Sequence, residues 1–196
     1  MSRASLRCAI AVAALVALPG CTAAPVRLYL NPQADLTHYD KVAVLPFTNL
    51  TSQPLAGDRV SRVFVTELII AGRYKVIEPA EFGGMLYRMG IEPSVQTGYD
   101  AAALARAADS LHVTGIVRGS VNEYDFQRMG QDEVPVISFD VELLDAATSD
   151  VVWRVSISRR GQGRLPLTGG SGTRSFGALT QEACMEAVSE LKKGAL

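Results

Sequence analysis

Histidine and cysteine, the residues that most often hold metals or carry nucleophilic chemistry, are scarce in this chain. The 196 residues include two histidines, His38 and His112, and three cysteines. Neither histidine stands in an H-E-x-x-H pattern, and no Cys/His cluster has the spacing of a zinc site. We therefore expect no metal and no cofactor, and we expect both histidines to be structural or solvent-facing.

Motifs for catalysis and for phosphate binding are also missing. The glycine-rich segment 169–174 is not a G-x-S-x-G nucleophile elbow, because Thr173 stands where the second glycine is needed. It is not a P-loop, because no Gly-Lys-Ser/Thr follows. Residues 169–177 lead into a predicted helix, so they form either an anion site at a helix N-terminus or a plain surface loop, and we expect the loop. The sequence predicts a protein that is not an enzyme.

Neither sign of charge is in excess. The chain has 19 lysines and arginines against 20 aspartates and glutamates, a net charge of −1. A protein that binds nucleic acid or anionic lipid through its overall field needs a strongly basic balance. We therefore expect no nucleic-acid partner.

No apolar run reaches the roughly 18 residues of a membrane-spanning helix, but the chain begins like an export signal. Arg3 and Arg7 precede the short apolar run 8–18, which ends at Leu-Pro-Gly-Cys over 18–21. This tetrapeptide resembles the bacterial lipobox, in which the cysteine is acylated before cleavage. The sequence thus predicts a signal peptide over 1–20 and a lipid on Cys21; the alternative is a secreted protein cut near residues 23–24. By resemblance to sorted lipoproteins, Thr22 favours the outer membrane, with the domain facing the periplasm.

Cleavage before Cys21 would leave 176 residues, 17 basic against 20 acidic, and one unmodified cysteine, Cys184. No internal disulfide is then available. Cys184 is either a reactive thiol or a small core residue. Its helical neighbours Val188 and Leu191 favour the core.

Residues 21–40 contain two prolines and little periodicity, so we interpret them as the lipidated N-terminus and a short tether. Residues 41–196 predict a single globular domain with the order β-α-β-α-α-β-β-β-α, an α/β (α+β) fold with a mixed sheet and a C-terminal β-hairpin. The expected strands cover 41–47, 73–77, 113–124, 137–143 and 151–157. Helices are expected from a cap at Asp58 to Gly72, from Pro79 to about Met89, from a cap at Asp100 to about Leu111, and from Ser175 onward.

The two strands of the C-terminal hairpin give the strongest periodicity. Apolar and polar residues alternate over 137–143 and again over 151–157. Each strand should therefore bury one face and expose the other. To place both apolar sets on one side, Arg154 must lie opposite Asp140 or Glu142.

A few charged and aromatic residues are candidates for partner binding. Arg159, Arg160 and Arg164 form a local basic group, which is either a solvated surface or a partner contact, because arginine is enriched at interfaces. Tyr124, at the end of a predicted strand, marks either an exposed edge or strand-end packing. We name all four as candidate partner-binding residues.

Four segments together resemble the CsgG/LpoB/TolB-N-like group of bacterial lipoproteins. They are Lys-Val-Ala-Val-Leu-Pro-Phe-Thr-Asn over 41–49, Arg-Tyr-Lys-Val-Ile-Glu over 73–78, the glycine-valine strand 114–124, and 141–153, which ends on Trp153. The resemblance implies non-enzymatic work in the envelope. LpoB-type members activate a peptidoglycan synthase, CsgG-type members assemble into a secretion ring, and the TolB domain is a protein-interaction module.

The chain departs from two of these types. Asp140, Glu142 and Arg154 on the exposed face of the 134–160 hairpin are unsuited to contact with lipid, unlike the strands of a secretion subunit. The tether is shorter than the long stalk of an LpoB-type activator. We therefore expect an outer-membrane-anchored adaptor in an envelope complex, with a peptidoglycan synthase as one partner, or alternatively a homo-oligomeric component of a secretion apparatus.

Overall fold

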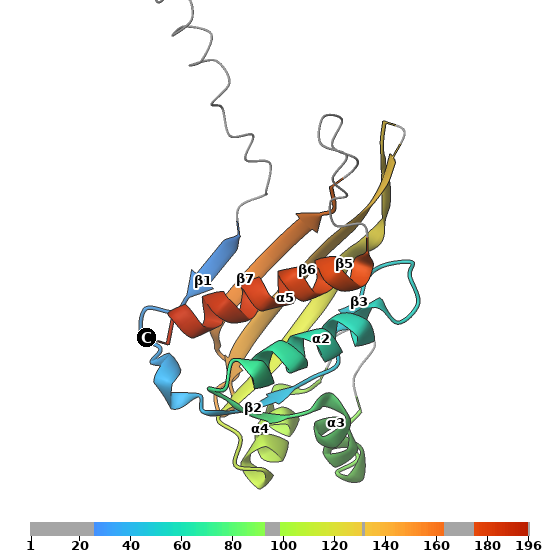
Figure 1. The fold of residues 1–196 in the computed structure, drawn as a ribbon. Helices are drawn as coiled ribbons and strands as arrows, with labels where there is room; N and C mark the ends of the chain where they lie inside the picture. The colour runs from blue at the N-terminus through green and yellow to red at the C-terminus, as the bar shows by residue number, and fades with distance from the viewer. Residues whose placement is uncertain (1–25, 93–98, 131, 163–174, 196) are drawn as a thin grey trace, which may run out of the picture.

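The computed structural model describes residues 26–92, 99–130, 132–162 and 175–195, which form a sheet covered by helices (Figure 1). The elements are β1 (Arg27–Leu30), the 3-10 helix η1 (Leu36–His38), β2 (Lys41–Val44), β3 (Thr48–Asn49), α2 (Ala56–Ile70), β4 (Lys75–Ile77), α3 (Pro79–Arg88), α4 (Ala101–Ser110), β5 (Gly115–Met129), β6 (Asp132–Asp145), β7 (Val151–Arg160) and α5 (Phe176–Lys193). Apart from β1, η1 and the two-residue β3, this is the predicted order.

The seven strands lie in the order β1-β7-β6-β5-β2-β4, and β3 also pairs with β5. Strand β2 is parallel to β4 and β5, whereas β5, β6, β7 and β1 are successively antiparallel. The parallel strands are joined by helical crossovers, and β5, β6 and β7 by tight turns, as each kind of pairing requires. The predicted fold class, with its mixed sheet and C-terminal hairpin, is confirmed.

Helices α2 and α5 lie side by side across one face of the sheet and enclose the main core (Figure 1). The largest buried side chains here include Phe64, Phe139 and Trp153. Burial of each such side chain contributes about 1.5–3 kcal/mol. This core therefore fixes which face of β5, β6 and β7 points inward.

A smaller core lies under α3 and α4. Phe82, Leu86 and Leu104 from these helices pack with Ile116 of β5 and Leu144 of β6. Ile116 and Leu144 face away from α2 and α5, because alternate strand residues point to opposite faces. Thus α3 and α4 cover one end of the second sheet face.

The N-terminal segment is more ordered than predicted. Residues 27–30 were expected within the tether, but they form β1, which pairs antiparallel with β7 at the edge of the sheet. Leu36 and Tyr39, also within the predicted tether, are 2% and 5% exposed. The tether prediction was wrong over this stretch, because two buried anchors and an open sheet edge hold a segment whose own periodicity is too short to indicate a strand.

Helix starts were predicted with mixed success. Pro79 stands at the first position of α3, and the Asp100 carboxylate caps α4 by accepting a hydrogen bond from the Ala103 N–H at 2.8 Å. The predicted cap at Asp58 is wrong. Helix α2 starts earlier, after Leu55 in a left-handed conformation with φ of 63°, since the small residues at 56 and 57 let its first turn pack closely against the chain after β2.

Candidate interaction surface

The part of the second sheet face beyond α3 and α4 carries a group of polar side chains. The strand register places Arg118, Glu142, Arg154 and Tyr29 in one row across β5, β6, β7 and β1. The next row across the same strands is Ser120, Asp140, Ser156 and Arg27. We call these eight residues, together with Asn122, the polar sheet face.

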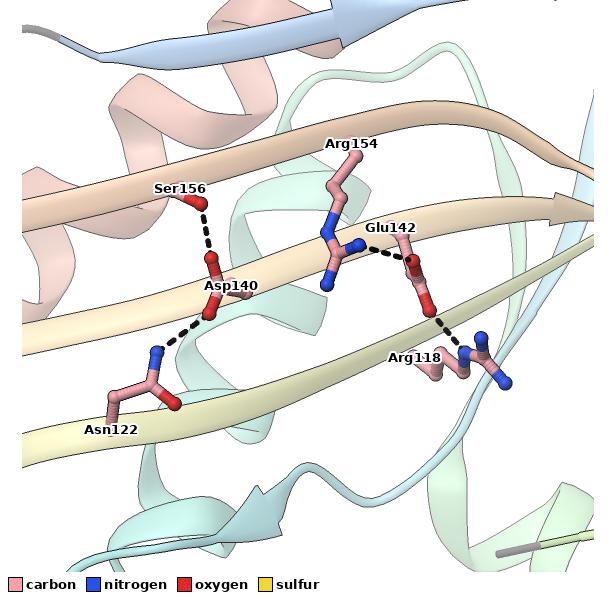
Figure 2. A network of polar contacts seen from close by, with 6 residues as sticks. All are labelled: Arg118, Asn122, Asp140, Glu142, Arg154 and Ser156. Atoms are coloured by element: carbon pink, nitrogen blue, oxygen red, sulfur yellow. Dashed lines mark hydrogen bonds and ion pairs between the residues drawn. The ribbon is translucent and has the colours of Figure 1, made fainter. Parts of the chain in front are cut away.

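Glu142 lies between two arginines from the neighbouring strands (Figure 2). Its carboxylate accepts a hydrogen bond from Nε of Arg118 and lies 3.7 Å from a terminal guanidinium nitrogen of Arg154. The Glu142 side chain is 11% exposed, whereas those of Arg118 and Arg154 are 49% and 54% exposed. The acid is therefore enclosed by the two bases, while both guanidinium groups remain open to solvent.

Asp140 is the second acidic residue of this face, and both of its oxygens are occupied (Figure 2). One accepts a hydrogen bond from the Asn122 amide nitrogen at 2.6 Å, and the other accepts one from the Ser156 hydroxyl. A register shift in β5 between Val121 and Glu123 leaves Asn122 without a direct partner on β6. Such a bulge re-aims a side chain, and here it lets Asn122 reach Asp140.

The hairpin prediction is confirmed, with one refinement. Arg154 lies directly opposite Glu142, one of the two predicted partners, and apolar residues of both strands point into the main core. The opposite face is not uniformly wet, however, because Glu142 as a residue is only 8% exposed. Two long arginine side chains cover a shorter acid between them, which alternation alone does not reveal.

The structure separates the arginines that the sequence grouped. Arg159 points toward α5, where its Nε donates to the Glu186 carboxylate at 2.8 Å. Arg160 points to the opposite face and donates to the Gln127 side chain at 2.9 Å. Adjacent strand residues always diverge in this way. Arg164 lies outside the described residues.

Tyr124 supports the packing alternative. It is 5% exposed, and its ring stacks on Phe176 of α5 with a centroid distance of 4.5 Å. Phe126 contacts the same ring edge-on at 4.6 Å. The Tyr124 ring is thus used within the chain, to hold the start of α5 against β5.

Two further candidates from the sequence lie wholly or mostly outside the described residues. Cys21, the predicted lipidation site, is one of them, so lipidation stays a prediction. The other is the 169–177 segment, of which only residues 175–177 are described, at the start of α5.

Cys184 is a core residue, as predicted from its helical neighbours. The residue is 0% exposed, and its thiol contacts the Val60 carbonyl oxygen at 3.9 Å. Burial, with a smaller effect of the Glu67 charge, raises the pKa of the Cys184 thiol well above its ordinary value. A thiol with a raised pKa is a poor nucleophile.

The polar sheet face contains none of the arginines named from the sequence, apart from the Arg154 of the hairpin. Arg118 and Asn122 went unrecognised because their place depends on the pairing of β5 with β6 and on the bulge. Across the described stretches of the chain, no three His, Cys, Asp or Glu side chains gather as a metal site. In the same stretches, no helix combines the length and apolar character needed to cross a bilayer.

Comparison with solved structures shows the same fold in other bacterial proteins. The dodecameric PelC from Paraburkholderia phytofirmans is 23% identical, with a TM-score of 0.60 over 86% of this chain and 98% of PelC. The lipoprotein GNA1162 from Neisseria meningitidis is 16% identical, with a TM-score of 0.54 over 78% of this chain and 98% of that protein. No family model and no curated protein sequence matches the chain. The coarser part of the sequence resemblance, a fold found in bacterial lipoproteins, is confirmed; membership of the CsgG and TolB types stays a prediction.

Proposed function

We propose that this protein is an outer-membrane-anchored lipoprotein, facing the periplasm, that acts by binding protein partners and not by catalysis. The observation that carries the proposal is the polar sheet face: ordered charged side chains on a rigid sheet, left uncovered by every helix of the described residues. The lipobox-like segment ending at Cys21 and the GNA1162 fold support the anchor. The sequence resemblance to LpoB-type lipoproteins adds a peptidoglycan synthase as one candidate partner.

Crosslinking in cells, followed by mass spectrometry of the captured proteins, tests this function. Reproducible capture of a periplasmic or envelope protein is the expected result. If the protein is abundant and correctly located but captures nothing, the adaptor function is wrong.

The anchor has a separate test. Cys21→Ala should move the protein out of the membrane fraction while leaving its thermal unfolding unchanged. Retention of the Cys21→Ala protein in membranes that resist salt washing would contradict lipidation at this position.

A second candidate function is a homo-oligomeric part of a secretion or assembly apparatus. It is favoured by the dodecameric state of PelC and by the two sheet edges, β1 and β4, that end the strand order. Edge strands present unpaired backbone groups that another chain can use. Native mass spectrometry of the detergent-purified protein separates the two functions, because a monomer at every concentration is incompatible with a ring.

A further inference from the structure

We infer that the polar sheet face is a docking site for an acidic segment of a protein partner, with Arg27, Arg118 and Arg154 as the residues that receive its carboxylates. This inference rests on the proposed protein-binding function and names the surface and the chemistry that carry it. The argument concerns which charges on this face are already used within the chain and which remain available.

The acids of this face are satisfied internally. Both oxygens of Asp140 accept hydrogen bonds from Asn122 and Ser156, and Glu142 is enclosed between Arg118 and Arg154. A carboxylate that is buried and bonded in this way does not compete for an incoming base. It instead holds the neighbouring side chains in place.

The bases remain available. Arg118 donates one hydrogen bond, through Nε, and its terminal nitrogens have no other partner in the described part of the chain. Arg154 approaches Glu142 only at 3.7 Å, which is too long for a hydrogen bond. Arg27 is exposed on the neighbouring β1, and it too lacks an ion pair or hydrogen bond to any described residue. An arginine presents five N–H donors in a fork that fits a carboxylate, so most donors on this face point outward unused.

The local charge is opposite to that of the whole chain. Three available arginines stand above two satisfied acids, in a protein whose overall net charge is −1. The three arginines also spread over four adjacent strands, which span about 14 Å at the usual strand spacing. A broad, flat basic face with an exposed tyrosine, Tyr29, suits a protein segment, whereas a small ligand needs a concave pocket.

A labelled peptide provides a direct test with the full chain purified in a neutral detergent. The probe is a fluorescein-tagged peptide in which glutamate alternates with serine, and the reference peptide has glutamine in place of glutamate. Fluorescence anisotropy at low salt should show binding of the glutamate peptide only. The double substitution Arg118→Gln with Arg154→Gln should weaken binding about tenfold, the loss expected for two charged contacts.

The matched control is Arg62→Gln with Arg106→Gln, which removes the same charge from exposed positions on α2 and α4. This pair should change peptide binding less than about twofold. Equal losses in both double variants, or no binding of the glutamate peptide by the unaltered protein, would overturn the inference. If the Arg118/Arg154 variant unfolds at a lower temperature, Arg27→Gln alone replaces it, because that side chain supports no contact within the described residues.

Crosslinking from defined positions separates this inference from the proposed function. A photoreactive phenylalanine derivative is placed at Tyr29 on the polar sheet face or at Gln181, exposed on α5. Capture from Tyr29 that disappears in the Arg118/Arg154 variant supports the inference. Capture from Gln181 only would leave protein binding intact but refute this surface, and capture from neither would reject the proposed function itself. Sedimentation with anionic vesicles that depends on Arg118 and Arg154, without peptide binding, would assign the face to membrane and overturn the inference.

Discussion

Gly57 in the first turn of α2 gives the sharpest test of how the helix meets the sheet. A Cβ added at this position would lie 2.3 Å from the carbonyl oxygen of Phe47 and 3.3 Å from the backbone nitrogen of Asn49. Both atoms belong to the backbone and cannot rotate away. Gly57→Ala therefore requires the start of α2 to move outward from the segment that joins β2 to β3.

The expected cost follows from two opposing contributions. Overpacking in a closely packed region costs about 1–3 kcal/mol, and contact with backbone places Gly57→Ala at the upper end. Replacing glycine by alanine in a helix returns about 1 kcal/mol. The net loss should be about 2 kcal/mol, which lowers the melting temperature of a domain of this size by about 4–8 °C.

Gly83 supplies the matched control, because the chemical change is identical. It lies inside α3, and a Cβ there would meet no atom within 4 Å. Gly83→Ala should therefore stabilise the protein by about 0.5–1 kcal/mol. Thermal unfolding followed by circular dichroism measures both variants. If Gly57→Ala is as stabilising as Gly83→Ala, the close approach of α2 to the β2–β3 segment is absent in solution and the reasoning fails.

Three further predictions concern titration, reactivity and the domain boundary. Burial acts to raise the pKa of Asp145, but hydrogen bonds from Thr148, Tyr39 and Ala147 outweigh it and lower the pKa below its ordinary value. The stabilisation from this carboxylate is thus present above about pH 4 and lost as the pH falls through the lowered pKa, so Asp145→Asn should cost more stability by urea unfolding at pH 7 than at pH 3. Burial and the bond to Asp145 raise the pKa of Tyr39 to about 12, so ultraviolet titration should show one late tyrosine that is missing in Tyr39→Phe. Cys184 should stay unreactive toward a thiol reagent until denaturant is added, and rapid labelling of the native protein would contradict its burial. A fragment that starts at residue 41 lacks β1, Leu36 and Tyr39, a loss of more than about 3 kcal/mol of burial alone, and should unfold well below a fragment that starts at residue 26.

Local chemistry predicted the C-terminal hairpin and two helix starts, because each depends on residues close together in the sequence. Alternation over 137–143 and 151–157 limited the register to pairings that place Arg154 beside an acid, and Pro79 and Asp100 fit first-turn positions on their own. The start of α2 was missed because it is set by contact with a distant segment, where Gly57 passes the Phe47 carbonyl, and not by the acidic residue that follows.

The candidate surface was only partly predictable, and the reason is strand geometry. Arg159 and Arg160 look like a cluster in the sequence, yet period two sends them to opposite faces of β7. Arg118 and Arg154 are 36 positions apart and meet only through Glu142, after β5, β6 and β7 have paired. A basic face assembled from isolated arginines on three strands leaves no contiguous signal in the sequence.

The place of β1 in the sheet also limits where a partner can be met. With a lipid on Cys21, six residues separate the anchor from Arg27, a reach of about 20 Å even when fully extended. Arg27 and Tyr29 are themselves part of the polar sheet face, so this face is held near the membrane surface by its own edge strand. An acidic partner of this surface therefore has to come to the anchored membrane, either as a protein of that membrane or through an extended segment of its own. This geometry argues against a domain that travels across the periplasm to a distant enzyme, and it favours a protein that receives its partner at the membrane.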